Sequence, residues 1–585
     1  MNWDYKKIYK TEEDFLSDVK FLLEDAKKIA SYKGKLHEKT YLKECLKAND
    51  KLGIKLEKIM IYASLNYAKN SKDIKNQQRE SLVNTTYAEA LNILAFMEPE
   101  LISLGEDHFT NLVNNDKDLA KYSYYFDKLF KNSRHILDEK SESIIANYNQ
   151  ALRGFNNLHN ILAIADNSDK KVMLQDGTEI LVNDANYRSY LEDLTSQEDR
   201  RRVFEAVFKF YADHKQTFAA IYNGIMQAEL ANVKNRNYDS ILESHLDLNN
   251  IPKEVFLTLI NTTKENTAPI KKYYELRRKY FNLEEIHTYD RFLQLKKSTK
   301  KYSYNEAKKI FFQAVKKIGG EFEKKAHLVL EEGRVDVLPS DGKRTGAFST
   351  GSYEKGTFIM LNHTGNLDSV FTLAHEAGHS IHTMFANENQ PYATADYTIF
   401  VAEIASTFNE SLLLDYLLSG DLDDDTKIVL LQQEIDNILS TFYRQALFAD
   451  FEYQAHHLVE EGKAVTYQSL SDIMKDLYFT YYNIYLTSEK YKEYVWAYIP
   501  HLFNTPFYVY QYATSYAASQ AIYQKVKNKE KDAVSNYLDL LKAGGSDYPV
   551  DLVKKAGVDL TKKDAFMAVV NRLEELVEKL ASLLE

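Results

Sequence analysis

No proline interrupts the chain between Pro99 and Pro252, and this gap constrains the fold more than any other feature of the sequence. Proline ends or kinks a helix because it lacks a backbone N–H and its ring clashes with the preceding turn. Only 8 prolines and 20 glycines occur among 585 residues, both well below average usage. Apolar residues also repeat at helical spacing, for example over 15–30 and 566–584. The sequence therefore predicts a mostly α fold.

Two short stretches depart from this helical pattern. Asp176-Gly177, flanked by β-forming residues over 172–182, predicts a short hairpin because Asp-Gly favours tight turns. Nine of the 20 glycines fall between residues 319 and 378, where 346–351 and 357–362 resemble short strands leading into a helix. We expect a small β-sheet beside that helix. An extended peptide can add as a further strand at a free edge, expected near 357–362.

Charge and composition narrow the range of partners. The chain carries 74 Lys and Arg against 85 Asp and Glu, a formal net charge of −11. This acidity disfavours nucleic acid as the main partner, since nucleic-acid-binding domains are usually basic. The single Cys45 excludes an internal disulfide and fits a reducing compartment. No run approaches 18 apolar residues, and the first residues lack an apolar signal core, so we predict a cytoplasmic protein without a membrane partner.

The pentapeptide His-Glu-Ala-Gly-His at 375–379 matches the HExxH pattern of zinc hydrolases. If residues 373–385 are helical, His375 and His379 lie one turn apart on the same face and can converge on one Zn²⁺ ion. Glu376 then points slightly off that face, where its carboxylate can take a proton from water without coordinating the metal. The neighbouring residues are almost all apolar, which indicates a buried helix whose polar groups need partners.

The class of zinc site depends on a third ligand. His382 follows the motif by three residues, which is poor geometry for a third ligand on the same helix, so we expect it at the surface or in a supporting position. The segment 400–410 resembles a second helix with Glu403 and Glu410 on one face. We predict Glu403 as the third ligand, with Glu410 or Asp396 as a carboxylate that orients the histidines. Two His and one Glu leave a fourth position open, as in catalytic zinc sites.

These residues resemble the thimet-oligopeptidase-type zinc metallopeptidases, a family of gluzincins, and are more similar to its bacterial oligoendopeptidase F branch. The resemblance rests on the HExxH motif followed by Glu403, Ser406 and Glu410. Supporting segments are 346–349, 361–379, 507–513 and 541–546. The similarity is strongest in the second half of the chain and extends more weakly upstream.

The resemblance implies a helical ellipsoid divided by a deep channel, with one zinc ion on the channel floor. Members of the family cleave internal bonds of short peptides and leave folded proteins intact. Their C-terminal cluster of His and Tyr, which contacts the substrate and the oxyanion, maps onto His501 and the tyrosines of 508–516. The candidates, in order of preference, are His501, Tyr508, Tyr512 and Tyr510. If this segment is helical, Tyr508 and Tyr512 share one face, and Tyr516 competes for the same role.

We expect three regions: a helical region over 1–110, a second helical region with the hairpin over 111–200, and a catalytic metallopeptidase domain over 201–585. The predicted function is hydrolysis of internal bonds of oligopeptides by an enzyme with one zinc ion per chain. The sequence leaves the oligomeric state open, and we favour a monomer. An alternative is a dipeptidyl carboxypeptidase-like exopeptidase, which would need a cationic or amide pocket for a free C-terminus. A less favoured alternative is an inactive peptide-binding protein, which would have no reason to keep Glu376.

Overall fold

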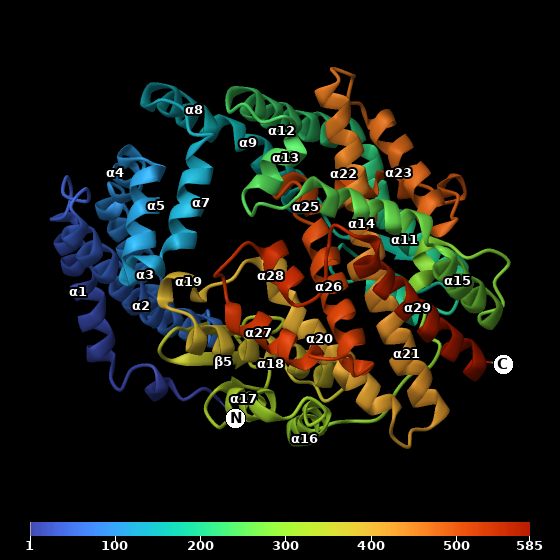
Figure 1. Cartoon of the computed structure of the whole chain (residues 1–585). Coiled ribbons are helices and arrows are strands. Elements are labelled where there is room, and N and C mark those ends of the chain that lie inside the picture. The colour runs from blue at the N-terminus through green and yellow to red at the C-terminus, as the bar shows by residue number, and fades with distance from the viewer. Residues whose placement is uncertain (1, 585) are drawn as a thin grey trace. The chain divides into compact units, whose positions relative to one another are not determined.

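The computed structural model describes residues 2–584, with every side chain except that of Gln150. Within that range about 70% of the residues are helical, and helices fill most of the cartoon (Figure 1). The strands form one sheet of two strands and one of three. The predicted mostly α fold is therefore confirmed. None of the described helices is long and apolar enough to cross a lipid bilayer.

The chain folds into two compact units, each built from three segments that are separated in the sequence. The first unit contains Met1–Arg134, Thr299–Gly420 and Ile522–Val558, and the second contains His135–Ser298, Asp421–Ala521 and Asp559–Glu585. The division into three regions expected from the sequence stays a prediction, as does the ellipsoid with a deep channel.

Helices build most of the first unit. Its first segment forms α1 (Glu12–Ala30), α2 (Lys39–Lys69), α3 (Ile74–Leu94), α4 (Met97–Leu104), α5 (Glu106–Asn115), α6 (Lys117–Ala120) and α7 (Ser123–Ser133). Its second segment forms α16 (Tyr304–Val315), α17 (Gly320–Val329), α18 (Leu367–Asn389), α19 (Tyr392–Ala395) and α20 (Ile399–Leu418). The third segment adds α27 (Ala533–Ala543) and α28 (Pro549–Lys555).

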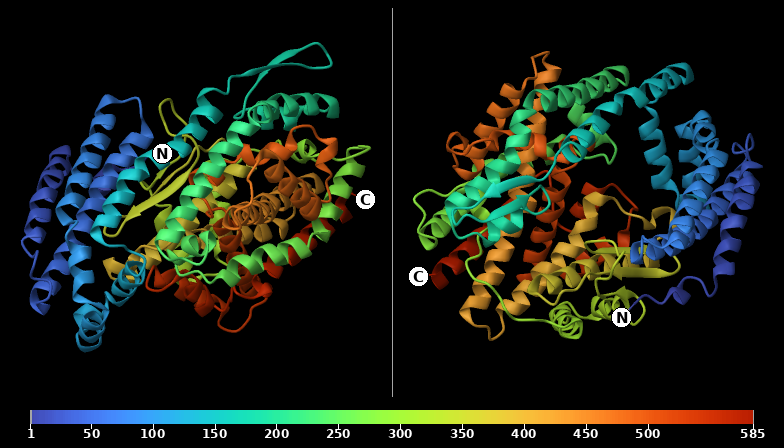
Figure 2. Two further views of the ribbon diagram at one scale, coloured as in Figure 1. Left: turned by 90° about the horizontal axis from the view of Figure 1, so that it is seen from above. Right: turned by 180° about the vertical axis from the view of Figure 1, so that it is seen from behind.

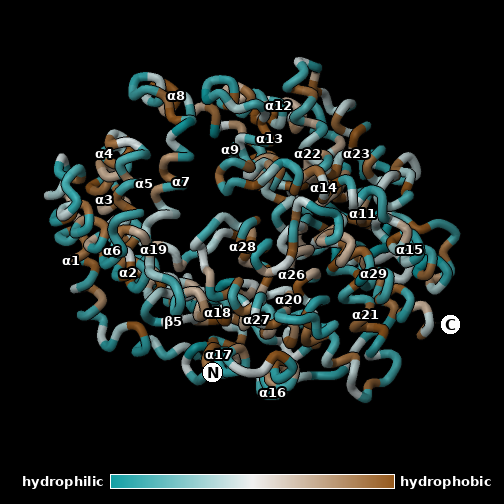
Figure 3. The backbone as a smooth tube through the Cα atoms, in the orientation of Figure 1, coloured by the Kyte–Doolittle hydropathy of each residue, from teal (hydrophilic) through white to brown (hydrophobic). Residues whose placement is uncertain are grey.

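Local sequence determines where α1 begins and which face it buries. The Thr11 hydroxyl accepts a hydrogen bond from the backbone N–H of Asp14, and the Asp14 carboxylate accepts one from the backbone N–H of Thr11. This reciprocal pair satisfies two donors that the helix would otherwise leave free. The buried residues recur every three or four positions: Phe15, Val19, Leu22, Ala26 and Ile29. Hydrophobic and hydrophilic stretches likewise alternate along the helices in Figure 3. This apolar face packs against α2 and α3.

The second unit is also mostly helical. Its first segment forms α8 (Glu139–Leu152), α9 (Gly154–Asn160), α10 (Tyr187–Asp193), α11 (Gln197–Asp213), α12 (Lys215–Asn235), α13 (Ile241–Asp247), α14 (Lys253–Glu265) and α15 (Ala268–Tyr280). Its later segments form α21 (Asp424–Ile438), α22 (Arg444–Glu460), α23 (Tyr467–Tyr482), α24 (Val495–Tyr498), α25 (Pro500–Asn504) and α29 (Lys563–Leu584). One helix, α26 (Tyr510–Lys527), begins in the second unit and ends in the first.

The hairpin predicted around Asp176-Gly177 is present in the second unit. Strand β1 (Lys170–Met173) pairs antiparallel with β2 (Glu179–Val182). Gly177 has a φ of +86°, a backbone conformation that other residues rarely adopt. The Asp176 carboxylate accepts a hydrogen bond of 2.8 Å from the backbone N–H of Thr178, which closes the turn. The hairpin packs against α11 (Figure 2).

The three-stranded sheet lies in the first unit and corrects one expectation. It contains β3 (Val335–Asp336), β4 (Phe348–Ser352) and β5 (Gly356–Met360). Strand β5 lies in the middle, parallel to β3 and antiparallel to β4. The free edge expected near 357–362 is therefore wrong, and β4 is an edge strand among the described residues. The order of the three strands could not be predicted from the sequence, because β3 is only two residues long and carries no recognisable pattern.

Helix α18 packs against β4, β5, α20 and α27. The Asn366 side chain caps its first turn by accepting a hydrogen bond of 2.9 Å from the backbone N–H of Ser369. The apolar residues that hold it in place are 0–7% exposed: Val370, Phe371, Leu373, Ala374, Ala377, Ile381 and Phe385. The sheet and these helices fix α18 along most of its length, so its polar groups have little freedom to move.

Candidate metal centre

The helices predicted around the motif and around 400–410 are both present, as α18 and α20. They bring His375, His379 and Glu403 together, with one nitrogen or oxygen atom from each within 4.8 Å of the others. The Nε2 atoms of the two histidines are 3.2 Å apart, and each lies 3.5 Å from Oε2 of Glu403. Their role as metal ligands stays a prediction.

The donor set matches the requirements of zinc in both chemistry and spacing. Neighbouring ligands of a tetrahedral zinc ion with bonds of about 2.0–2.1 Å are about 3.3–3.4 Å apart. The three donor atoms of the protein stand at nearly this spacing. Imidazole nitrogen and carboxylate oxygen are both usual zinc ligands, and three protein ligands leave one position open. These residues therefore fit a catalytic zinc ion.

Gly378 allows α18 and α20 to approach closely enough to form this donor set. A Cβ atom at Gly378 would lie 2.5 Å from the carbonyl oxygen of Ala405 and 2.7 Å from Cα of Ser406. No side chain fits at these distances, because both contacts are with backbone atoms. Gly378 destabilises the helix by about 1 kcal/mol relative to alanine. In return, it permits the close contact that places Glu403 beside the histidines.

Further contacts orient the donors, and two of these contacts are hydrogen bonds. Oε1 of Glu410 lies 2.9 Å from Nδ1 of His375, on the side of the ring opposite the donor nitrogen. The Ser406 hydroxyl donates a hydrogen bond of 2.8 Å to Oε2 of Glu403. The ring of His379 lies beside the backbone of Ala402. Contacts of this kind fix the tautomer and orientation of metal-binding histidines.

The carboxyl of Glu376 is buried beside the donor set and only 7% exposed. Burial raises the pKa of Glu376 to about 7; His375 opposes this shift, and the carboxylates of Glu403 and Glu410 add to it. The backbone of Ser349, on the edge strand β4, lies beside the Glu376 carboxyl and lowers its pKa slightly against the effect of burial. Burial lowers the pKa of His375, but Glu410 and Glu403 outweigh burial and raise that pKa to about 9. The surrounding carboxylates thus favour positive charge at this point, which suits a divalent cation.

The structure corrects the placement of His382. Its side chain is only 1% exposed, so the surface position considered from the sequence is wrong. The ring stacks on Tyr397 with centroids 3.7 Å apart, and neither ring nitrogen has a hydrogen-bond partner among the described residues. Burial lowers the pKa of His382 to about 3, so the ring is neutral. Its location follows from the packing of the segment after α18, which no local pattern in the sequence reveals.

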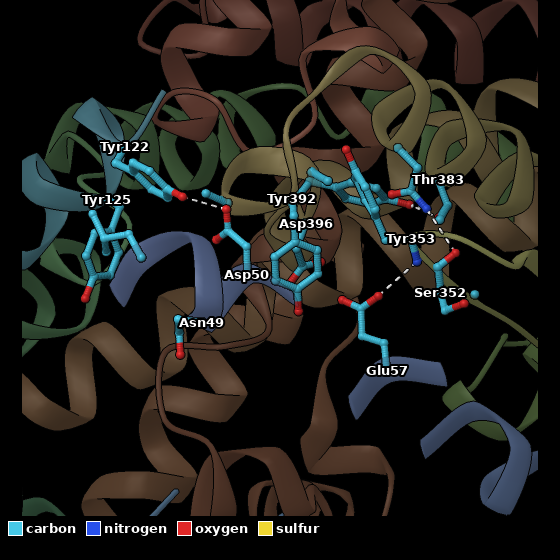
Figure 4. A pocket seen from close by; sticks show the side chains of 16 residues that line it. Asn49, Asp50, Glu57, Tyr122, Tyr125, Ser352, Tyr353, Thr383, Tyr392 and Asp396 are labelled. Atoms are coloured by element: carbon cyan, nitrogen blue, oxygen red, sulfur yellow. Dashed lines mark hydrogen bonds between the residues drawn. The ribbon is translucent and has the colours of Figure 1, made fainter. Parts of the chain in front are cut away.

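Asp396, the other carboxylate considered as a support, lies elsewhere. With Asp50 and Glu57 it lines a separate cavity of about 450 Å³ that borders α18 at Thr383 and Asn387 (Figure 4). Burial raises the pKa of both Asp396 and Glu57. None of the described residues that line this cavity is Lys or Arg. No hydrogen bond joins Asp396 to a motif histidine in the described chain, so the carboxylate support of the donor set comes from α20.

His501, Tyr508 and Tyr512 meet in the second unit. His501 lies on α25, and its ring centroid is 6.1 Å from those of both Tyr508 and Tyr512. The two tyrosine rings are 5.4 Å apart and nearly perpendicular. The shared helix expected for them is wrong, because α26 begins at Tyr510 and Tyr508 precedes it. Burial lowers the pKa of His501.

The two remaining tyrosine candidates are not part of this group of three rings. Tyr510 is 3% exposed and packs edge-on against Phe256, with centroids 5.4 Å apart. The hydroxyl of Tyr516 is 2.9 Å from Oε1 of Glu434. Both tyrosines are core residues of the second unit, and this leaves His501, Tyr508 and Tyr512 as the ring cluster to test for contact with substrate.

Comparisons with known proteins show that this chain is similar to peptidases along its whole length. The model of peptidase family M3 matches residues 190–572, and the model described as oligopeptidase F matches residues 100–167. Oligopeptidase PepF of Bacillus subtilis is 32% identical over 584 residues, covering 100% of this chain and 87% of that protein. Group B oligopeptidase PepB of Streptococcus agalactiae is 32% identical over 582 residues, covering 99% and 96%.

Solved structures show the same fold. A structure from Chlamydophila abortus has a TM-score of 0.93 and 31% identity, with 100% of this chain and 98% of that chain covered. Oligoendopeptidase-F from Enterococcus faecium has a TM-score of 0.73 and 27% identity, with 98% and 99% covered. The resemblance noted from the motifs is confirmed over the full length, and the chain belongs to the oligoendopeptidase F branch of peptidase family M3.

Proposed function

We propose that the protein is a zinc-dependent endopeptidase that hydrolyses internal bonds of short oligopeptides. The observation that carries this proposal is the triad of His375, His379 and Glu403 at zinc-ligand spacing, with the buried Glu376 carboxylate beside it. Membership of peptidase family M3 supports the reaction class. The names of the curated relatives, oligopeptidase and oligoendopeptidase, support short peptides as substrates.

Each residue near the donor set has a distinct role in this proposal. His375, His379 and Glu403 would hold the zinc ion, which when bound polarises a carbonyl and lowers the pKa of water. Glu376 accepts the proton of the attacking water and passes it to the leaving amine. Burial helps this exchange because it raises the carboxyl pKa of Glu376 toward neutrality. Glu410 keeps the His375 ring in a fixed orientation.

The edge strand β4 offers a docking place for the substrate backbone. An extended peptide can pair with a free strand edge through main-chain hydrogen bonds, which recognise any sequence. Strand β4 packs against α18, which carries the proposed general base, and the backbone of Ser349 on β4 lies beside the Glu376 carboxyl. A peptide paired with β4 would thus run past the carboxylate that handles the proton.

The first prediction concerns products. Incubation with a library of peptides of mixed length should give internal cuts, mapped by mass spectrometry, and a zinc chelator should abolish them. Stepwise release of dipeptides from the C-terminus would instead favour the carboxypeptidase-like alternative. Cleavage that is unaffected by prolonged chelation would exclude the zinc-dependent mechanism.

A second prediction concerns His501 and Tyr508, which we propose as donors to the developing oxyanion because they meet in one ring cluster. Removal of one oxyanion donor lowers kcat by roughly 10²–10³-fold in other enzymes. We expect this loss for His501→Ala or Tyr508→Phe, with little change in KM, because the contact forms only in the transition state. Tyr510→Phe is the matched control, since the Tyr510 ring is in the core. Unchanged kcat in both test variants would remove these two residues from the mechanism.

A further inference from the structure

The backbone at Phe507 has a conformation that a bulky residue rarely adopts. Its φ is +52°, in the left-handed region where a side chain crowds its own backbone. Phe507 lies in the connection between α25 and α26 and directly precedes Tyr508, a member of the ring cluster proposed to contact substrate. Such a conformation persists only where the surrounding structure holds it, and it often occurs at functional sites. The contacts that hold Phe507 therefore matter for Tyr508.

Glu452 on α22 holds the backbone of Phe507. The backbone N–H of Phe507 donates a hydrogen bond of 2.8 Å to Oε1 of Glu452. The Glu452 side chain is fully buried, and its Oε2 atom has no hydrogen-bond partner among the described residues. Burial raises the pKa of Glu452 to about 8, although the charge of His456 and the N–H of Phe507 oppose this rise. At neutral pH the carboxyl is therefore mostly protonated, which avoids the cost of a buried charge without a partner.

His456 lies one turn after Glu452 on α22 and links this helix to α12. Its Nδ1 atom is 2.7 Å from the carbonyl oxygen of Glu452, and its Nε2 atom is 2.9 Å from Oε2 of Glu229. Burial opposes the charge of Glu229, but hydrogen bonds from His245 and His456 outweigh burial and lower the pKa of Glu229 to about 2. Both ring nitrogens of His456 thus face acceptors, so both carry a proton. This network joins α12, α13 and α22, which pack together (Figure 1).

The two histidines of this network also hold the ring of Phe507. The Phe507 ring centroid is 4.7 Å from that of His456 and 5.4 Å from that of His245. Phe507 is 3% exposed, whereas the next residue, Tyr508, is only half-buried. Consecutive residues share a planar peptide bond, so the backbone of Phe507 sets the direction in which the Tyr508 side chain leaves the chain.

We propose that Glu452 is a positioning residue for the peptidase reaction: it holds the backbone of Phe507 and thereby fixes Tyr508 in the ring cluster with His501. The inference rests on the proposed function, in which Tyr508 is a donor to the oxyanion. Glu452 acts only through Phe507 and Tyr508 and does not itself contact substrate. A catalytic group misplaced by about 1 Å can lower the rate by about 10²-fold, so the effect on turnover should be large.

The test compares Glu452→Met with Glu452→Gln in the full-length enzyme. Methionine has a similar length but offers no acceptor to the Phe507 N–H, so kcat should fall by about 10²-fold with little change in KM. Glutamine keeps an acceptor oxygen and resembles the protonated carboxyl, so it should restore kcat to near the wild-type value. Gln454→Met is the matched control, because it places the same side chain on α22 at a residue that bonds to Asp450. Equal losses in Glu452→Gln and Glu452→Met would overturn the inference.

A double-mutant cycle separates positioning of Tyr508 from a general loss of structure. If Glu452 acts through the Tyr508 hydroxyl, Glu452→Met should cause no further loss of kcat in Tyr508→Phe protein, because the two changes remove the same interaction. A loss as large in this background as in wild type would contradict the proposed role of Glu452.

Hydrogen exchange tests the anchor without any measurement of activity. The Phe507 amide should exchange slowly in wild type and in Gln454→Met, and rapidly in Glu452→Met. This pattern supports the anchor even if no peptide is cleaved, in which case the proposed function alone fails. If Glu452→Met does not fold, the exchange rate in wild type decides: slow exchange at Phe507 supports the inference, and exchange as fast as in an unfolded peptide overturns it.

Discussion

Replacement of Glu376 by glutamine is expected to lower kcat by roughly 10²–10⁴-fold, the usual contribution of a general base. The carboxamide keeps the size of the side chain and its place beside Ser349, but it cannot accept the proton of the attacking water. KM should change little, because Glu376 is not among the residues proposed to bind the peptide. The protein should also keep its metal, because the donor atoms belong to three other side chains.

Steady-state kinetics of wild type and variant with one fluorogenic peptide measure this loss. Glu388→Gln is the matched control: it makes the same chemical change on the same helix, at a residue paired with Lys325. The control should retain wild-type turnover. A Glu376→Gln variant that also retains it would show that another group handles the proton.

Replacement of His375 by alanine is expected to abolish activity while leaving the fold intact. Loss of one of three ligands removes the metal, so the reduction should at least match the 10²–10⁴-fold cost of losing the general base. Helix α18 should stay folded because the buried apolar residues that pack it against its neighbours do not include His375. Far-UV circular dichroism should therefore match wild type.

Thermal unfolding separates loss of the metal from loss of the fold. A ligand that binds only the native state raises Tm by mass action. Added zinc should therefore raise the Tm of metal-free wild type and leave the Tm of His375→Ala unchanged. A variant that unfolds before zinc is added would instead assign His375 a structural role.

The features that could be predicted from the sequence are those set by local geometry. His375 and His379 share a face because they are one helical turn apart. Glu403 and Glu410 share a face because seven residues make about two turns. The close approach at Gly378 also had a local signal, since a glycine within an apolar helix is costly without a contact that needs it. The fold class followed from the scarcity of proline and glycine.

The features that could not be predicted depend on packing between distant segments. The order of the three-stranded sheet depends on β3, which is too short to leave a pattern. The burial of His382 depends on the ring of Tyr397, which follows on a separate segment.

The most direct test of the proposed metal centre is the zinc content of purified protein, measured by elemental analysis after dialysis. Wild type and Glu376→Gln should each retain about one zinc ion per chain, as expected for a single site with three protein ligands. His375→Ala should retain almost none. Equal zinc in all three proteins would contradict the assignment of His375, His379 and Glu403 as the ligands, and with it the proposed mechanism.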